Sequence, residues 1–154
     1  MSVLVISSHA EFEKHLGQSL GSSEYFQIQQ DRINNFAEAT IDPQWIHTDP
    51  ERAKDGPFGT TIAHGYLTVS LIPYLWKQIV QIDNVKMMVN YGIENLRFNQ
   101  AVPVDGEVKL HVTLDSIANL RGITKAVLGA KLEIKGQKKP AYTGSFVFLY
   151  HFND

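Results

Sequence analysis

The chain has 154 residues, of which 44% are hydrophobic and 19% are charged, and its formal net charge is -2. It is long enough for one hydrophobic core and too short for two ordinary domains, so we expect a single globular domain over residues 1–154. The charge lacks the basic excess of nucleic-acid binders, and the absence of cysteine excludes disulfides, thiolate catalysis and Cys-based zinc sites.

The beginning of the chain carries no targeting signal that we can identify. Met1–Ser8 is apolar in its middle but has no basic flank, so it is expected to form a terminal strand or arm rather than a signal peptide. No later segment approaches the roughly 20 apolar residues that cross a bilayer. We therefore expect a cytoplasmic protein without membrane contact.

The first half of the chain predicts a short strand and then a helix. The strand covers 25–28, and apolar residues follow at helical spacing over 33–37, with Asp31 available as an N-cap. This helix is expected to end near Asp42, because Pro43 disfavours the α conformation in the residue before it.

The most apolar stretch runs from Thr61 to Val80, after one expected helical turn at 50–54. It is apolar almost all round, which is typical of a helix enclosed by other elements. Pro73 lies inside it, and an interior proline costs about 3 kcal/mol unless the helix bends or begins there. A bend is therefore expected between Val69 and Pro73.

The second half of the chain is rich in β-forming residues. Strands are expected over four runs separated by turn residues, namely 86–98, 106–117, 123–134 and 141–152. Residues 108–115 alternate between apolar and polar, which predicts a strand with one solvated face. The turn spacing predicts an antiparallel meander, and a long buried helix against such a sheet is an α+β fold.

Asp42 and His47 are candidate catalytic residues. On a continuous helix their spacing of five would place them about 140° apart, but the break at Pro43 allows the loop to turn both side chains toward one point. Trp45 and Ile46 can bury the loop, and a carboxylate next to an imidazole can transfer protons. Taken alone, the pattern is also typical of an ordinary turn with a structural histidine.

A turn of small residues opens the apolar helix and is a candidate binding site. The first N–H groups of a helix lack intrahelical partners, and glycine permits close approach of a ligand. Ile62, His64 and Gly65 are therefore candidates for holding a thioester carbonyl and its developing oxyanion. For Gly65, close packing of the helix on the sheet is the alternative explanation.

No metal or other cofactor is expected. The potential ligands in the two motifs are Asp42, His47, Asp49 and His64, but they match no recognised metal-binding spacing. The remaining histidines have no partner pattern and are read as surface or packing residues. Three lysines, Lys135, Lys138 and Lys139, could meet a phosphate, although a solvated hairpin turn is the favoured interpretation.

In combination, these motifs resemble the MaoC-like dehydratases, which include the (R)-specific enoyl-CoA hydratases and the nodulation protein N-like proteins. The resemblance is carried by the run 36–50 and by 58–65. Downstream, Leu96-Arg97-Phe98 with Pro103-Val104 and Gly106-Glu107 looks like the strand entry of that family. The similarity spans roughly residues 25–150.

The resemblance implies a hot-dog fold, in which an antiparallel sheet wraps around a long central helix and the protein acts as a homodimer. It implies hydration of a trans-2-enoyl-CoA in fatty acid metabolism, with Asp42 and His47 as the acid–base pair. Gly65 matches the glycine whose N–H binds the thioester oxygen, and no cofactor beyond the CoA of the substrate is implied. Gln44 and Trp45 replace the usual Asn and Pro, which affects the expected chain-length preference.

Two other functions remain open on the same fold. A thioesterase would direct water at the thioester carbonyl, and such enzymes generally carry an acidic residue on the central helix. Residues 65–80 contain none, which argues against this function. The other alternative is a non-catalytic acyl-CoA-binding protein.

Overall fold

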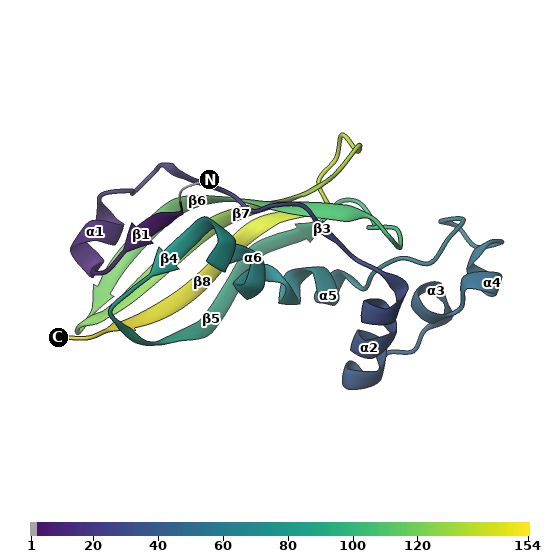
Figure 1. The fold of residues 1–154 in the computed structure, drawn as a ribbon, viewed down its shortest axis with the longest axis horizontal. Helices are drawn as coiled ribbons and strands as arrows, with labels where there is room; N and C mark the ends of the chain where they lie inside the picture. Colours follow the sequence, from purple (N-terminus) through teal and green to yellow (C-terminus); the bar gives the residue numbers. More distant parts are fainter. Residues whose placement is uncertain (1–2) are drawn as a thin grey trace.

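The computed structural model describes residues 3–154 and consists of a curved antiparallel sheet wrapped around two short helices (Figure 1). The sheet has six strands in the order β2-β6-β7-β8-β5, and β3 also pairs with β6. Its strands are β2 (Ser19–Ser22), β3 (Phe26–Gln27), β5 (Val85–Phe98), β6 (Glu107–Leu120), β7 (Ile123–Ile134) and β8 (Tyr142–Phe152). The α+β expectation is confirmed.

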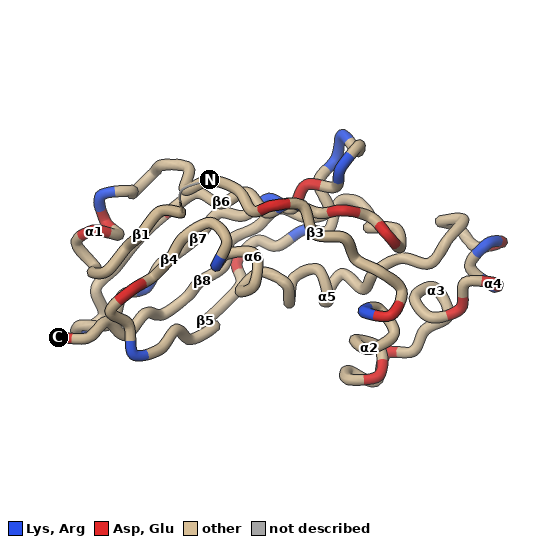
Figure 2. The backbone as a smooth tube through the Cα atoms, in the orientation of Figure 1, with Lys and Arg blue, Asp and Glu red and all other residues tan. Residues whose placement is uncertain are grey.

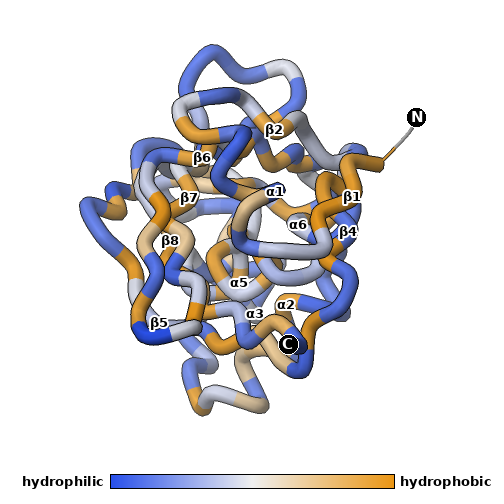
Figure 3. Tube along the Cα trace, turned by 90° about the vertical axis from the view of Figure 1, so that its left-hand side faces the viewer, coloured by the Kyte–Doolittle hydropathy of each residue, from blue (hydrophilic) through white to orange (hydrophobic). Residues whose placement is uncertain are grey.

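The expected apolar helix is present as two helices, α5 (Gly65–Ser70) and α6 (Ile72–Ile79). Pro73 lies in the first turn of α6, where its missing N–H costs little, so the predicted bend is confirmed at Leu71. The helix begins at Gly65 rather than at Thr61. Figure 3 shows both helices enclosed by the curved sheet.

The buried faces of these helices supply much of the core. Leu75 and Trp76 of α6 are buried against the sheet. The indole N–H of Trp76 donates a hydrogen bond of 2.6 Å to the hydroxyl of Tyr150 on β8. Because this hydrogen bond satisfies both buried polar groups, it fixes how the helix sits on the sheet.

Helix α2 covers Gln30–Thr40, so it begins before Asp31, the residue that was expected to cap it. The N-cap is Gln29. The prediction of Asp31 as the N-cap is wrong, because the carboxylate of Asp31 accepts the N–H of Arg32 inside the first turn. The helix ends at Ile41, which adopts the left-handed conformation with φ 58°. The expected helix end near Asp42 is confirmed.

Two short helices follow, α3 (Trp45–Thr48) and α4 (Pro50–Ala53). The turn at α4 was expected, whereas α3 was not. At the other end of the molecule lie α1 (His9–Glu13) and a parallel pair formed by β1 (Leu4–Ile6) and β4 (Val80–Ile82). The terminal strand is thus confirmed, and residues 1–2 of that expectation lie outside the described residues.

The expected meander is correct only for β6, β7 and β8. Strand β5 precedes them in the chain but pairs with β8 at the far edge of the sheet. The meander expectation was wrong for β5, because turn spacing carries no information about the partner of a strand that reaches its neighbour by a long connection. Within residues 3–154, no helix is long and apolar enough to cross a bilayer.

Candidate active site

Asp42 leaves α2 at an angle set by the residue before it. Ile41 is β-branched, and such residues adopt a positive φ only when the surrounding structure enforces it. The turn is closed by the N–H of Asp42, which donates to the carbonyl of Ala37 at 2.9 Å. The aspartate side chain is about half exposed, at 54%, and it lines a cavity beside α5.

His47 lies on α3 and is 7% exposed. Its Nδ1 is 2.8 Å from the carbonyl oxygen of Ile62, and because a carbonyl only accepts, Nδ1 carries the proton and donates. The neutral ring therefore keeps its lone pair on Nε2. Burial lowers the pKa of His47 from its ordinary 6.5, and a charge on His64 lowers it further, while the Ile62 hydrogen bond and Asp42 oppose the shift.

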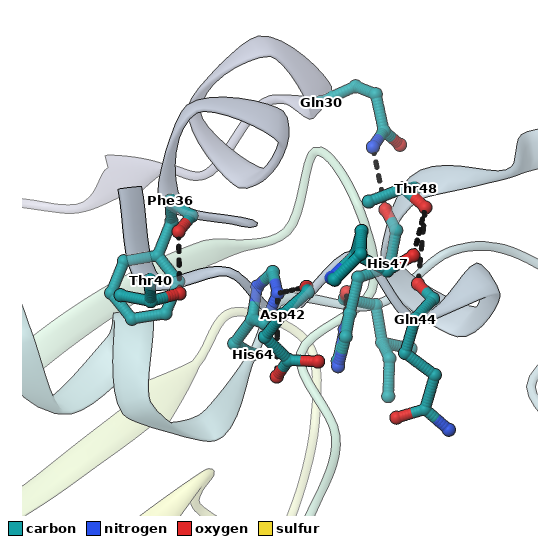
Figure 4. Close-up of polar contacts among 10 residues, drawn as sticks. Gln30, Phe36, Thr40, Asp42, Gln44, His47, Thr48 and His64 are labelled. Atoms are coloured by element: carbon teal, nitrogen blue, oxygen red, sulfur yellow. Dashed lines mark hydrogen bonds and ion pairs between the residues drawn. The ribbon is translucent and has the colours of Figure 1, made fainter. Parts of the chain in front are cut away.

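A polar network holds the loop that carries His47. The side-chain amide of Gln30 donates to the carbonyl of His47 at 2.7 Å and accepts from the hydroxyl of Thr61 at 2.6 Å. The hydroxyl of Thr48 donates to the carbonyl of Pro43 at 3.0 Å. These bonds tie α2, α3 and the segment before α5 together around the site (Figure 4).

The loop between α2 and α3 brings the carboxylate and the imidazole together, as the sequence predicted. One nitrogen or oxygen atom each from Asp42, His47 and His64 lies within 4.8 Å of the others. A water molecule that makes two hydrogen bonds of about 2.8 Å at a tetrahedral angle spans about 4.6 Å. A separation of up to 4.8 Å is therefore one that a single shared water can bridge.

This pair faces a cavity of about 510 Å³ that is large enough for an acyl thioester. Its walls come from the two motifs, from the end of β5 and from the segment that follows, and the lining residues include Asp42, His47, Phe58, Ile62, His64, Gly65, Phe98, Gln100 and Val102. All five predicted site residues line it. Phe58, Phe98 and Gln100 were missed as site residues, although Phe98 belongs to the Leu96-Arg97-Phe98 run noted as a strand entry.

Gly65 opens α5, and its N–H has no hydrogen-bond acceptor within residues 3–154. The ring of Phe98 lies over it so closely that a Cβ at position 65 would be 2.8 Å from the ring. Close packing and a free N–H are thus combined at one glycine. Asp49, in contrast, turns away and caps α4 by accepting the N–H of Arg52 at 3.1 Å.

Trp45, at the position where the resemblance leads us to expect proline, packs on the loop that follows α4. A Cβ at Gly56 would be 2.9 Å from the Trp45 ring, so the indole lies directly on that glycine. The guanidinium of Arg52 lies 4.4 Å from the ring centroid on Trp45, in a cation–π contact. The substitution therefore covers the outside of the site loop.

Comparison with known proteins identifies the family. The model of the MaoC like domain matches residues 11–136. The chain belongs to the MaoC-like dehydratase family. It is 40% identical over 144 residues to the 3-hydroxyacyl-thioester dehydratase Z of Mycobacterium tuberculosis, covering 93% of this chain and 95% of the relative. It is 36% identical over 150 residues to the nodulation protein N of Rhizobium leguminosarum, covering 95% and 92%.

Solved structures confirm the hot-dog fold of this MaoC-like protein. The R-hydratase PhaJ1 of Pseudomonas aeruginosa superposes with a TM-score of 0.75 at 19% identity, covering 97% of this chain and 87% of that one. The (R)-hydratase of A. caviae involved in PHA biosynthesis gives a TM-score of 0.70 at 26% identity, covering 86% and 94%. Together with the family match, these relatives support a hydratase or dehydratase.

Proposed function

We propose that this MaoC-like protein is an (R)-specific enoyl-CoA hydratase/dehydratase, a hydro-lyase that adds water across a trans-2-enoyl-CoA double bond. The observation that carries the proposal is the convergence of Asp42 and His47 on one cavity, whose wall includes Gly65, with an N–H that has no acceptor among the described residues 3–154. Ile62, His64 and Gly65 would form the end of the cavity that receives the thioester carbonyl. The direct test is hydration of crotonyl-CoA, followed by the loss of its enoyl-thioester absorbance.

In this mechanism a water is held between the Asp42 carboxylate and Nε2 of His47. Its oxygen bonds to C3, one of its protons passes to the pair, and the pair delivers a proton to C2. The π bond is lost, and the protonation of the pair is unchanged after the cycle. Negative charge that develops on the thioester oxygen is stabilised by the N–H of Gly65, and the reaction requires no metal or redox cofactor.

The pH dependence follows from the lowered pKa of His47. Neutral His47 is the form with a free Nε2, so the acid limb of kcat/KM, in which the ring becomes protonated, is expected to lie below the ordinary histidine pKa of 6.5. Because the pKa of His47 is lowered in the folded protein, the unfolded chain binds this proton at a higher pH than the folded protein does. At pH values above the ordinary histidine pKa, neutral His47 therefore contributes to the free energy of unfolding. This contribution is lost as the pH falls through the lowered pKa.

A kcat/KM–pH profile on crotonyl-CoA and a series of urea titrations at several pH values measure both effects. An acid limb centred above pH 6.5 would contradict the assignment of a neutral buried imidazole. A His151→Gln variant is a suitable control, because His151 lies on β8, away from the cavity.

A second cavity supports CoA as the carrier of the acyl group. It has a volume of about 380 Å³ and shares five lining residues with the catalytic cavity, namely Phe58, Ile62, Asn99, Gln100 and Ala101. It extends to Gln137, in the turn between β7 and β8. Lys138 and Lys139 follow directly, are exposed, and form a basic tip visible in Figure 2.

Removing the two lysines in Lys138→Gln/Lys139→Gln is expected to raise the KM for crotonyl-CoA about 3- to 10-fold, because each exposed charge adds a modest attraction for a phosphate. The KM for crotonyl-pantetheine, which lacks the nucleotide, should be unchanged. The matched control removes two exposed lysines elsewhere, in Lys14→Gln/Lys77→Gln. Equal effects on both substrates would contradict a role for the turn in binding CoA.

We further propose a homodimer formed through β5. This strand is at the edge of the sheet, and in the part of the chain that the structure describes one side of its backbone pairs with no other strand. It carries exposed apolar side chains. Met87, Val89, Tyr91 and Ile93 are between 37% and 58% exposed. An apolar edge strand of this kind is typical of an interface between chains.

Ile93→Asp is expected to convert the dimer to a monomer, since a buried unpaired carboxylate opposes association. Sedimentation velocity measures the change. Leu120→Asp is the matched control, because Leu120 is also apolar and is 41% exposed, against 52% for Ile93, but lies at the end of β6. A wild-type chain that sediments as a monomer would contradict the proposal.

Two other hot-dog functions are distinguished by the products. A thioesterase would release free CoA from saturated acyl-CoA, and helices α5 and α6 carry no acidic side chain to direct such an attack. A non-catalytic binder would retain acyl-CoA in calorimetry without any turnover. Calorimetry and the hydration assay on the same preparation separate all three.

A further inference from the structure

His64 is a buried polar side chain of the site, with 3% exposure, and it precedes the first residue of α5. Its Nε2 lies 3.0 Å from the carbonyl oxygen of Asp42. A carbonyl oxygen only accepts, so Nε2 carries the proton and donates to the backbone of Asp42. Nδ1 is left with a lone pair and has no hydrogen-bond partner within residues 3–154.

The same ring stacks on His47. The two ring centroids are 3.8 Å apart, and the planes differ by 21°. The ring of Phe36 on α2 also contacts His64, with centroids 4.9 Å apart. The histidine therefore joins α2, the site loop and the start of α5 (Figure 4).

We infer that His64 is a positioning residue, which holds Asp42 through its N–H and His47 through its ring face. The two contacts use different parts of the imidazole, so one side chain sets the place of both catalytic groups. An error of about 1 Å in such groups can lower the rate about 100-fold. The inference rests on the proposed hydratase function.

A metal site built from Asp42, His47 and His64 is the competing explanation of this cluster. The lone pairs of an imidazole lie in the ring plane. The rings of His47 and His64 are stacked and nearly parallel, so their lone pairs lie in two separate planes and do not converge on one ion. In addition, Nε2 of His64 is occupied by the Asp42 carbonyl. The geometry favours a positioning role.

Two substitutions separate the two contacts. His64→Phe keeps a ring face for His47 and removes the N–H, whereas His64→Gln keeps an N–H donor near the position of Nε2 and removes the ring. His64→Ala removes both. Its kcat for crotonyl-CoA is expected to fall about 100-fold, with partial recovery to about 10-fold losses in the Phe and Gln variants, while KM changes less than about 2-fold.

A second readout is independent of turnover. Nitrogen NMR of the His47 ring is expected to show the tautomer with a proton on Nδ1 in the wild type, and a mixture of tautomers in His64→Ala. The groups that face His47 in this argument are His64, before α5, and Asp42, after α2.

Each outcome decides the inference. Wild-type kcat in His64→Ala, or equal losses in all three variants with no change in the His47 NMR signals, would overturn it. Activation by Zn²⁺ together with loss of activity on chelation would support the metal site instead. If the wild type does not hydrate enoyl-CoA, the proposed function fails, and the NMR comparison alone then decides whether His64 positions His47.

Discussion

Asp42→Asn and His47→Gln are each expected to lower kcat for crotonyl-CoA hydration by about 100-fold or more. Each replacement keeps the approximate size of the side chain but removes a group that can accept a proton from water. KM should change little, because in the proposed function the acyl and CoA parts of the substrate bind to other residues of the cavity. Steady-state kinetics on purified variants measure the effect.

Asp49→Asn is the matched control for this experiment. Asp49 lies in the same loop and caps α4, and asparagine caps helices as well as aspartate does, so kcat and stability should both be unchanged. Wild-type turnover in either of the two active-site variants would exclude the acid–base mechanism. Loss of turnover in Asp49→Asn as well would show that the loop, rather than the pair, is sensitive to substitution.

Replacing Gly65 tests the proposed oxyanion contact. Proline is tolerated at the first position of a helix, where its missing N–H has no intrahelical partner. Gly65→Pro therefore removes the N–H that faces the cavity, and kcat is expected to fall about 100- to 1000-fold. The proline ring also displaces Phe98, since a Cβ at this position meets that ring at 2.8 Å.

Gly65→Ala separates these two effects, because alanine adds the same Cβ but retains the N–H. The exposed ring of Phe98 can move aside, so Ala is expected to alter KM more than kcat. The ratio of kcat between the Ala and Pro variants isolates the contribution of the N–H. A ratio near one would exclude Gly65 as the donor to the thioester oxygen.

Local patterns were sufficient to predict the two motifs of the site. The break at Pro43 and the apolar helix after Gly65 each depend on residues that are neighbours in the sequence. Features of this kind can therefore be predicted without knowing the tertiary contacts. The convergence of Asp42 and His47 required only that the helix stop between them. The left-handed Ile41, which sets the direction of Asp42, was not predictable, because a β-branched residue adopts this conformation only under tertiary constraint.

Contacts between distant segments could not be predicted in the same way. His64 was read as part of the substrate-binding turn, but its N–H ends on the carbonyl of Asp42, 22 residues away. Phe98 enters the cavity because β5 runs along the sheet edge beside β8, a pairing that no periodicity encodes. The Gln137 side of the second cavity likewise depends on where a hairpin turn projects.

The central claim is that one water between Asp42 and His47 adds to C3 of an enoyl thioester. Incubation of the wild-type protein with crotonyl-CoA in oxygen-labelled water tests it most directly. The account predicts (R)-3-hydroxybutyryl-CoA with the label at C3 and the thioester intact. Label in a free carboxylate with release of CoA, or unchanged crotonyl-CoA that is bound but not converted, would contradict it.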